Sequence, residues 1–183
     1  MKEYTIVSDV RAALELVRSV ASHDAHFYEH MADAPCTLYF DVDLKAHDAL
    51  ERKWEILDAN VEWIVWFLGE LGHVVSRRDL RVLDGSREGK ASFHVLVPRL
   101  VLLNDAHRVK LQAAIRRCLA RRGSDIDAAP YRRNALLRTP FSSKFGTNAP
   151  LRPLYDWARG TEGRPEGLES EGPEGPSGPS GPA

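Results

Sequence analysis

The sequence lacks the features that mark secreted, membrane-spanning and disulfide-stabilised proteins. Its 183 residues include two cysteines, Cys36 and Cys118, too few for a disulfide framework or a four-ligand zinc site. Both lie among apolar residues, so we expect small buried side chains in a reducing compartment. The longest apolar run, WIVWFL at 63–68, is too short to cross a bilayer, and the N-terminus has no continuous apolar signal region. These absences predict an intracellular protein without a membrane segment.

Each part of the chain is also short of charge of one sign. Residues 1–76 carry 6 Lys and Arg against 14 Asp and Glu, whereas residues 77–152 carry 17 against 6. The net charge of −1 conceals this asymmetry. A compact basic stretch is typical of a phosphate-binding surface, although an ordinary solvated face has the same composition.

Apolar residues nearly vanish after residue 158. The segment TEGRPEGLESEGPEGPSGPSGPA (161–183) consists mainly of Gly, Pro, Ser and Glu. Such a composition cannot bury enough apolar surface to offset the entropy lost on ordering. We therefore expect one folded domain over 1–158, with its core at about 27–150, and a disordered tail over 159–183.

Hydrophobic periodicity predicts an N-terminal helix followed by elements in the order β-α-β-β-α-β. The expected helices cover 9–20, 48–71 and about 105–122, and the expected strands cover 37–44, 80–84, 92–98 and 135–139. Asp48 is a candidate N-cap for the second helix, and Gly72 is its stop signal. This order predicts an α/β (α+β) protein with a ferredoxin-like or RNA-recognition-motif core and a mostly antiparallel sheet. The first and third strands would be central, the fourth would flank the first, and one sheet face would be free.

Two carboxylates interrupt the apolar strand LYFDVDL (38–44). Alternation directs Phe40 and Val42 towards the helices and Asp41 and Asp43 to the opposite face. On the expected neighbouring strand, Ser92 and His94 face the same way as the aspartates, and a third acid is available at Asp125 or Asp127. Adjacent carboxylates repel one another unless a cation neutralises them, and all-oxygen ligands favour Mg²⁺ or Mn²⁺. A solvated edge strand and an exposed histidine are the ordinary readings of these patterns taken singly.

The basic segment YRRNALLRTPFSSKFG (131–146) follows the third acid. It interleaves Arg138, Lys144 and further arginines with Tyr131 and Phe141. Guanidinium and ammonium groups suit triphosphate oxygens, and an aromatic ring can stack on a base or sugar. The arginines at 77, 78, 81, 116, 117, 121 and 122 read first as solvated faces and second as contacts to a template backbone.

These motifs together resemble the archaeo-eukaryotic primase superfamily, most closely its primase-polymerase branch. The resemblance lies in PCTLYFDVD (35–43), KASFH (90–94) and DAAPYRRNALLRTPFSSKFG (127–146), which occur in the family's order. It implies template-directed nucleotidyl transfer by DNA primases and polymerases. It assigns two divalent ions, Mg²⁺ or Mn²⁺, to Asp41, Asp43 and Asp127. The residues that it assigns to the incoming nucleotide are Lys90, Ser92, His94, Asn134, Arg138, Ser143 and Lys144.

The resemblance also implies partners. A primed single-stranded DNA template and an NTP or dNTP are expected, with a helicase or other replication protein as a further partner. The implied location is the nucleus or a viral replication compartment for a eukaryotic or viral source, and otherwise the cytoplasm. The chain lacks the zinc cluster and the N-terminal module of several relatives, so we expect primer extension rather than de novo priming. A non-catalytic nucleic-acid-binding module and a metal-dependent nuclease are the alternatives.

Overall fold

The computed structural model describes residues 9–20, 25–31, 33–133, 135–155 and 157. The predicted tail over 159–183 lies outside the described residues. The described part holds three α-helices, two short 3-10 helices and seven strands. In chain order they are α1 (Val10–Ser19), β1 (Tyr28–Met31), β2 (Cys36–Lys45), α2 (Lys53–Glu70), η1 (Arg77–Asp79), β3 (Arg81–Asp84), β4 (Lys90–Leu102), α3 (Asp105–Arg121), β5 (Ile126–Asp127), η2 (Ala129–Tyr131), β6 (Ala135–Arg138) and β7 (Arg152–Leu154).

The main sheet has the strand order β5-β2-β4-β3-β7, and every neighbouring pair is antiparallel. Within this sheet the strands β5, β2, β4 and β3 follow the ferredoxin-like arrangement. This confirms the predicted fold class and the central position of β2 and β4. The N-terminal helix is also confirmed as α1, where the Asp9 side chain accepts a hydrogen bond from the Ala12 N–H. β7 adds a fifth strand beside β3.

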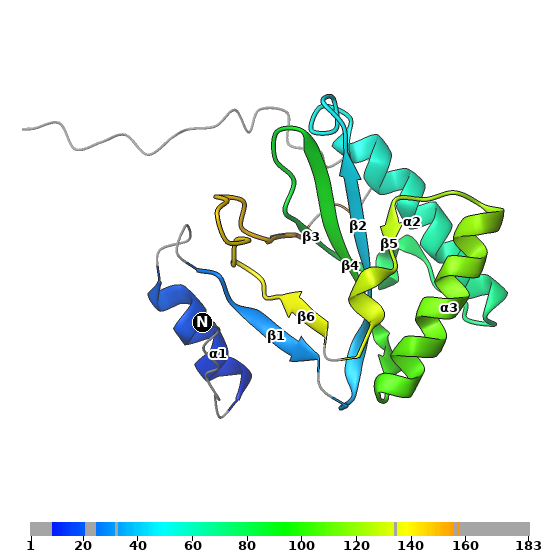
Figure 1. Ribbon diagram of the computed structural model, residues 1–183, viewed down its shortest axis with the longest axis horizontal. Helices are drawn as coiled ribbons and strands as arrows, with labels where there is room; N and C mark the ends of the chain where they lie inside the picture. Colours follow the sequence, from blue (N-terminus) through cyan, green and yellow to red (C-terminus); the bar gives the residue numbers. More distant parts are fainter. Residues whose placement is uncertain (1–8, 21–24, 32, 134, 156, 158–183) are drawn as a thin grey trace, which may run out of the picture.

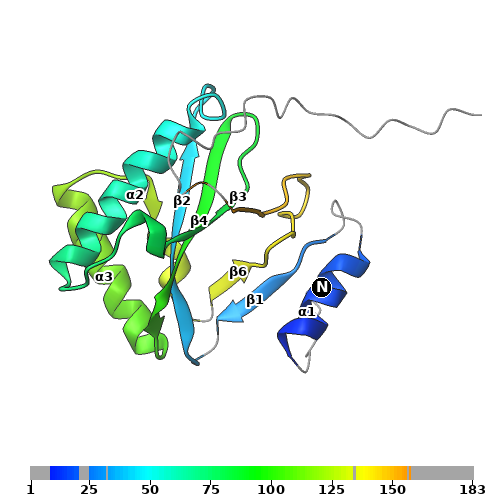
Figure 2. The ribbon, with the colours of Figure 1, turned by 180° about the vertical axis from the view of Figure 1, so that it is seen from behind.

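The prediction for the fourth strand is wrong. The two-residue strand β5 occupies the position beside β2, and residues 135–138 form β6, which pairs with β1 in a separate two-stranded sheet. Figures 1 and 2 show this small sheet on the side of the main sheet opposite α2 and α3. Met31 and Ala135 from the small sheet belong to the hydrophobic core. The face predicted to be free is therefore partly covered.

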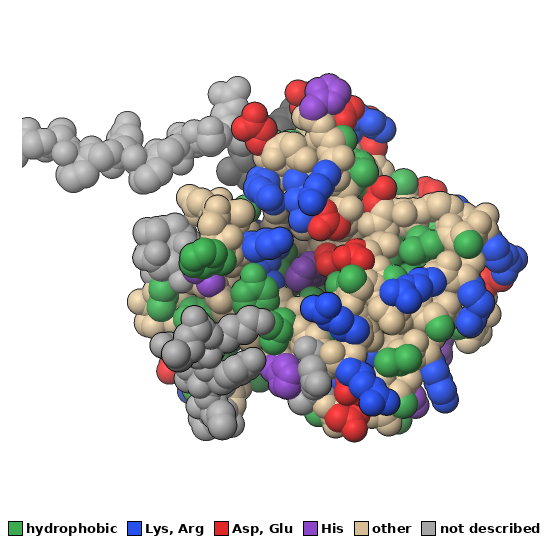
Figure 3. Space-filling view, in the orientation of Figure 1, with side chains coloured by type: hydrophobic (Ala, Val, Ile, Leu, Met, Phe, Trp, Pro, Cys, Tyr) green, Lys and Arg blue, Asp and Glu red, His purple; other side chains and the backbone are tan. Residues whose placement is uncertain are grey.

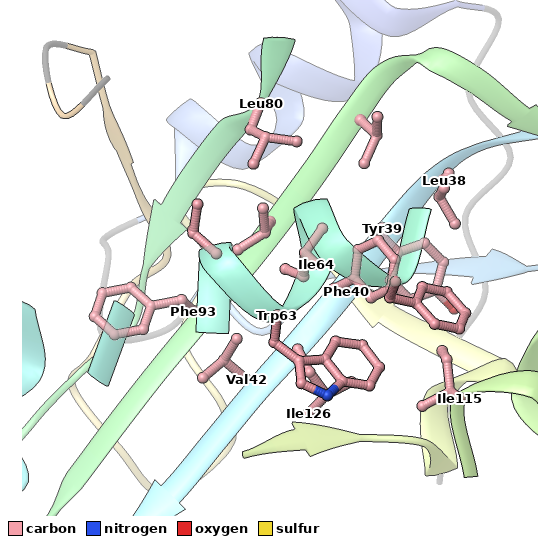
Figure 4. Packing of buried hydrophobic residues seen from close by; sticks show 14 of the residues in the cluster. Leu38, Tyr39, Phe40, Val42, Trp63, Ile64, Leu80, Phe93, Ile115 and Ile126 are labelled. Carbon is pink, nitrogen blue, oxygen red and sulfur yellow. The ribbon is translucent and has the colours of Figure 1, made fainter. Parts of the chain in front are cut away.

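The hydrophobic core fills the space between the main sheet and the helices α2 and α3, and it extends to Met31 and Ala135 of the small sheet. Phe40, Val42, Phe93 and Val95 are fully buried, as strand alternation predicts. Phe40 meets Phe67 of α2 edge to face, with ring centroids 5.9 Å apart. Figure 4 shows Phe40 and Val42 of β2 close to Trp63 and Ile64 of α2. Because these residues of β2 and β4 point towards the helices, the residues that alternate with them project from the other face of the sheet.

Helix α2 begins later than the sequence indicates and ends where it indicates. Residues 47–52 form turns, Arg52 is the N-cap, and the Asp48 carboxylate pairs with the Arg52 guanidinium, so the predicted cap at Asp48 is wrong. At the other end Gly72 has φ +83°, and the N–H of His73 donates to the Leu68 carbonyl. This is a Schellman-type ending, which requires a left-handed residue and therefore favours glycine.

Candidate functional site

Strand register brings the first motif residues together. In the β2–β4 pair, Asp41 lies directly opposite His94, and Asp43 lies opposite Ser92. In the β2–β5 pair, Asp41 lies opposite Asp127. Directly opposed residues of an antiparallel pair project from the same face. The predicted convergence of the two aspartates, Ser92 and His94 is confirmed, and Asp127 extends the row onto a third strand.

The structure separates the two candidates for the third acid. The Asp125 carboxylate accepts a hydrogen bond at 3.0 Å from the Asn60 side chain, which is buried in α2. Asp127 instead lies in register with Asp41, and its Oδ1 accepts a hydrogen bond from the Ala129 N–H. Asp125 is thus tied to the helix layer, and Asp127 is the acid on the candidate site.

Burial and repulsion among carboxylates dominate the electrostatics of Asp41. Its side chain is 17% exposed. Burial, followed by the neighbouring charges of Asp43 and Asp127, raises the pKa of Asp41 to about 7, while Lys90 and Arg138 act in the opposite direction. The Asp41 carboxyl is therefore partly protonated near neutral pH.

Lys90 supplies the nearest counter-charge. Its ammonium lies 2.7 Å from Asp43 Oδ2, and both side chains are largely buried. The second oxygen, Asp43 Oδ1, is buried and has no hydrogen-bond partner among the described residues. One carboxylate oxygen is therefore neutralised by the protein, and its neighbour retains its acceptor capacity.

His94 is held as a neutral imidazole. Burial, together with the charges of Arg138 and Lys90, lowers the pKa of His94 to about 3. Its Nε2 lies 3.7 Å from Asp41 Oδ1, a contact that is no ion pair near neutral pH because the ring carries no charge. His94 Nδ1 is buried without a hydrogen-bond partner in the described part of the chain. A neutral ring with an unused nitrogen can donate or accept one hydrogen bond from a ligand.

Arg138 reaches the site from the small sheet. Its guanidinium donates to the Ala149 carbonyl at 3.0 Å, and burial lowers the pKa of Arg138 although Asp41 and Asp43 favour its charged form. A Cβ at Gly85 would lie 2.7 Å from Arg138 Nη2, so glycine leaves the space that this guanidinium needs. Arg138 thus faces the carboxylates across the two layers, as a phosphate-binding group at this site would.

Other predicted site residues are less directly placed. Ser92 is buried beside the aspartates, and its N–H donates to Ser86 Oγ. Ser143 is fully buried, and its backbone bonds to Ala25, so its side chain has no exposed surface for a ligand. Lys144 is exposed in the following turn. Asn134 lies outside the described residues.

Tyr131 does not serve as the stacking platform that the sequence indicated. It is fully buried, stacks on Tyr39 with ring centroids 5.1 Å apart, and donates its hydroxyl to the Tyr39 carbonyl. Burial raises the pKa of Tyr131 well above its ordinary value. Its place is structural, because η2 carries the ring onto the face of β2.

Two basic residues near the site were missed by the sequence reasoning. Arg87, in the turn before β4, lies close enough to Arg138 to lower the pKa of that guanidinium. Lys45 lines an open pocket with Asp43, Ser124, Asp125, Ile126 and Asp127. Figure 3 shows acidic and histidine side chains in a hollow bordered by Lys and Arg. The position of Arg87, in a turn three residues before Lys90, could have indicated from the sequence that it lies near the site.

The donor set fits a hard divalent cation, although the carboxylates are not gathered as metal ligands. Among the described residues, no three His, Cys, Asp or Glu side chains form a group that could hold a metal ion. The fit rests on the chemistry of the oxygens: mutual repulsion at Asp41 and an unpartnered buried oxygen at Asp43. Opposed residues of antiparallel strands have Cβ atoms about 4.5–5.5 Å apart, so Asp41 and Asp127 are within reach of a shared ion.

Comparisons with known proteins add no family assignment. No family model matches the sequence, and no curated protein matches it.

Cys36 and Cys118 are both free and partly buried. No helix in the described ranges is long and apolar enough to span a membrane.

Proposed function

We propose that the protein catalyses template-directed nucleotidyl transfer, extending a primer on a single-stranded DNA template. The observation that carries this proposal is the register that aligns Asp41 with both His94 and Asp127, with Asp43 opposite Ser92. Acidic oxygens and a neutral histidine therefore share one face, with Lys90 and Arg138 beside them. The order of motifs in the sequence supports the same activity.

In this proposal Asp41, Asp43 and Asp127 would hold two divalent ions. Bound there, the ions would lower the pKa of the attacking primer hydroxyl and offset charge at the phosphorus. That hydroxyl loses its proton to water and its oxygen forms a bond to the α-phosphorus of the nucleotide. The bond from this phosphorus to the bridging oxygen of the β-phosphate breaks, which releases pyrophosphate. Asp41 lies at the centre of the row, opposite both Asp127 and His94, and would orient this exchange together with Asp127.

The cationic residues would hold the triphosphate. Arg138 presents a planar fork suited to phosphate oxygens, and the Lys90 ammonium lies beside Asp43. His94, being neutral, would donate one hydrogen bond without adding charge. A nucleotide between these groups would satisfy the unused polar capacity of His94 and of the guanidinium.

The experiment is primer extension on a short DNA template with dNTPs and either Mn²⁺ or Mg²⁺. The wild-type chain should extend the primer, and Asp41→Ala should lower the rate by at least about 100-fold, because losing the metal removes several kcal/mol of transition-state stabilisation. Glu62→Gln, an exposed change on α2, is the matched control and should extend normally. Degradation of the primer would instead indicate a nuclease.

A non-catalytic nucleic-acid-binding module is the second candidate. It is favoured by the absence of a gathered three-residue metal-binding group among the described residues, and by the ion pair that engages Asp43 with Lys90. This candidate predicts DNA binding without extension or cleavage under any metal condition. The same assay, run beside a binding measurement, separates the two candidates.

A further inference from the structure

Helix α3 carries a straight row of cations on its outer side. Lys110, Arg117 and Arg121 are spaced i, i+7 and i+11, which places them within about 40° of one another around the helix axis. With a rise of 1.5 Å per residue, the row is roughly 16 Å long. All three side chains are exposed. We call these residues the α3 stripe.

The charge of the α3 stripe is not neutralised by its surroundings. No acidic residue occurs between Asp105 and Asp125 in the sequence. The carboxylates in the described ranges that form ion pairs do so with other residues, and none pairs with the stripe. Arg116 and Arg122 add exposed positive charge on the flanks of the same helix. This part of the surface therefore has an uncompensated positive potential.

The α3 stripe adjoins the candidate site around the edge of the sheet. The end of α3 is anchored by the Trp63 indole, which donates to the Arg122 carbonyl at 2.8 Å. The chain then passes through Gly123 to Ser124 and β5, where the pocket is lined by Asp127 and Lys45. Figures 1 and 3 show α3 flanking β5 and basic side chains on this helix. A polyanion along α3 would point towards that pocket.

We propose that the α3 stripe binds the phosphate backbone of a nucleic acid and leads it over β5 to the candidate site. Three cations over about 16 Å match two to three successive phosphates of one strand, which are spaced by several ångströms. The exposed residues Ala113 and Ala120 beside the row are small, so a backbone can approach closely. A membrane surface is disfavoured, because interfacial helices place large apolar residues beside their basic ones.

The inference deepens the proposed function by assigning a surface to its template, and it rests on that function only for the choice of DNA. The test measures binding alone. The variant carries Lys110→Gln, Arg117→Gln and Arg121→Gln. The control removes equal charge elsewhere, through Arg11→Gln, Arg18→Gln and Arg99→Gln, all of which are exposed. Fluorescence anisotropy with a labelled 20-base-pair duplex and a labelled single strand is recorded from 50 to 200 mM KCl.

The α3 variant should bind both DNAs at least about 10-fold more weakly at 50 mM KCl. Its slope of log affinity against log salt should fall by about 2–3 for the duplex, since each phosphate contact contributes about 0.9. The control variant should stay within about 2-fold of wild type. Equal losses in the two variants, unchanged binding in the α3 variant, or no binding by wild type would each overturn the inference.

Two further readouts separate this inference from its alternatives. Vesicles containing phosphatidylserine test the membrane reading: stripe-dependent vesicle binding with unchanged DNA binding would overturn the inference. Primer extension by wild type tests the proposed function independently. If wild type binds DNA through the stripe but extends no primer, the function fails and the inference stands. If the α3 variant binds DNA normally and extends the primer normally, the inference fails and the proposed function stands.

Discussion

Among single residues, Asp41 lowers the stability of the fold, because its carboxylate is buried near other carboxylates. A carboxylate whose folded pKa is raised binds its proton more tightly when folded than when unfolded, so stability falls as pH rises through that interval. For Asp41 the interval runs from its ordinary 3.8 to about 7. Above pH 7 the full cost is present, and it is relieved at low pH.

Asp41→Asn should therefore raise the free energy of unfolding in a buffer containing a chelator. The gain should grow between about pH 4 and pH 7, stay constant above, and reach about 1–3 kcal/mol. This is less than the roughly 4 kcal/mol that the whole shift implies, because a buried amide replaces the carboxylate. Urea unfolding at several pH values measures it. Glu62→Gln should change stability by less than about 0.5 kcal/mol at every pH, and a loss of stability in Asp41→Asn at pH 8 would contradict the account.

Gly85 is the second residue whose identity the site explains. An added Cβ would approach Arg138 Nη2 to 2.7 Å and Leu151 Cδ2 to 3.0 Å. Gly85→Ala should displace the guanidinium, cost about 1–2 kcal/mol in stability, and weaken binding of a fluorescent dNTP analogue about 5–10-fold, the loss of one charge-assisted contact. Gly123→Ala, whose Cβ would meet no atom within 4 Å, is the matched control. Normal nucleotide affinity in Gly85→Ala would argue that Arg138 does not contact the ligand.

Single residues were predictable from the sequence where alternation alone decides their direction. Asp41, Asp43, Ser92 and His94 were placed correctly because strand residues two apart share a face. Tyr131 was not, because its burial depends on η2 folding back onto Tyr39, a contact between segments about 90 residues apart. Periodicity within one segment carries no information about such a contact.

At the scale of elements, Arg108 holds α3 to the connection between the two sheets. Its side chain is fully buried, pairs with Asp105, and donates to the Met31 carbonyl at 3.0 Å. The Asp105 N–H in turn donates to the Asp33 carboxylate. The first turn of α3 is thus fixed to Met31, the last residue of β1, and to Asp33, which precedes β2.

Arg108→Met should destabilise the protein by about 3 kcal/mol, because removing one partner of a buried pair leaves the other charge and a carbonyl uncompensated. Equilibrium unfolding in urea measures the change. Arg116→Met, on an exposed position of the same helix, should change stability by less than about 0.5 kcal/mol. Equal stability of the two variants would show that Arg108 is not the link between these elements.

Helices and strands could be predicted where the hydrophobicity of their own residues is periodic. The helices and the strands β2, β3 and β4 were found, whereas β5 has two residues and no pattern to read. β1 was missed because Tyr28, Glu29 and His30 are exposed and do not alternate with apolar residues. The segment 135–138 was recognised as a strand but assigned to the wrong sheet, since its partner β1 was unknown.

In the molecule as a whole, the two sheets contribute different residues to the candidate site. The main sheet supplies the carboxylates and His94, and the small sheet supplies Arg138 from the opposite side. The helix layer buries the other face of β2 and carries the α3 stripe. The arrangement lets one strand, β2, belong both to the hydrophobic core and to a polar site.

We propose that the row of carboxylates across β2 and β5 takes part directly in nucleotidyl transfer. The most direct test is primer extension with Mn²⁺ by two matched variants, Asp127→Asn and Asp125→Asn. These acids are two residues apart, but only Asp127 lies opposite Asp41, while Asp125 bonds to Asn60 of α2. Asp127→Asn should abolish extension, and Asp125→Asn should largely retain it. Equal activity of the two variants, or no extension by the wild-type chain, would contradict it.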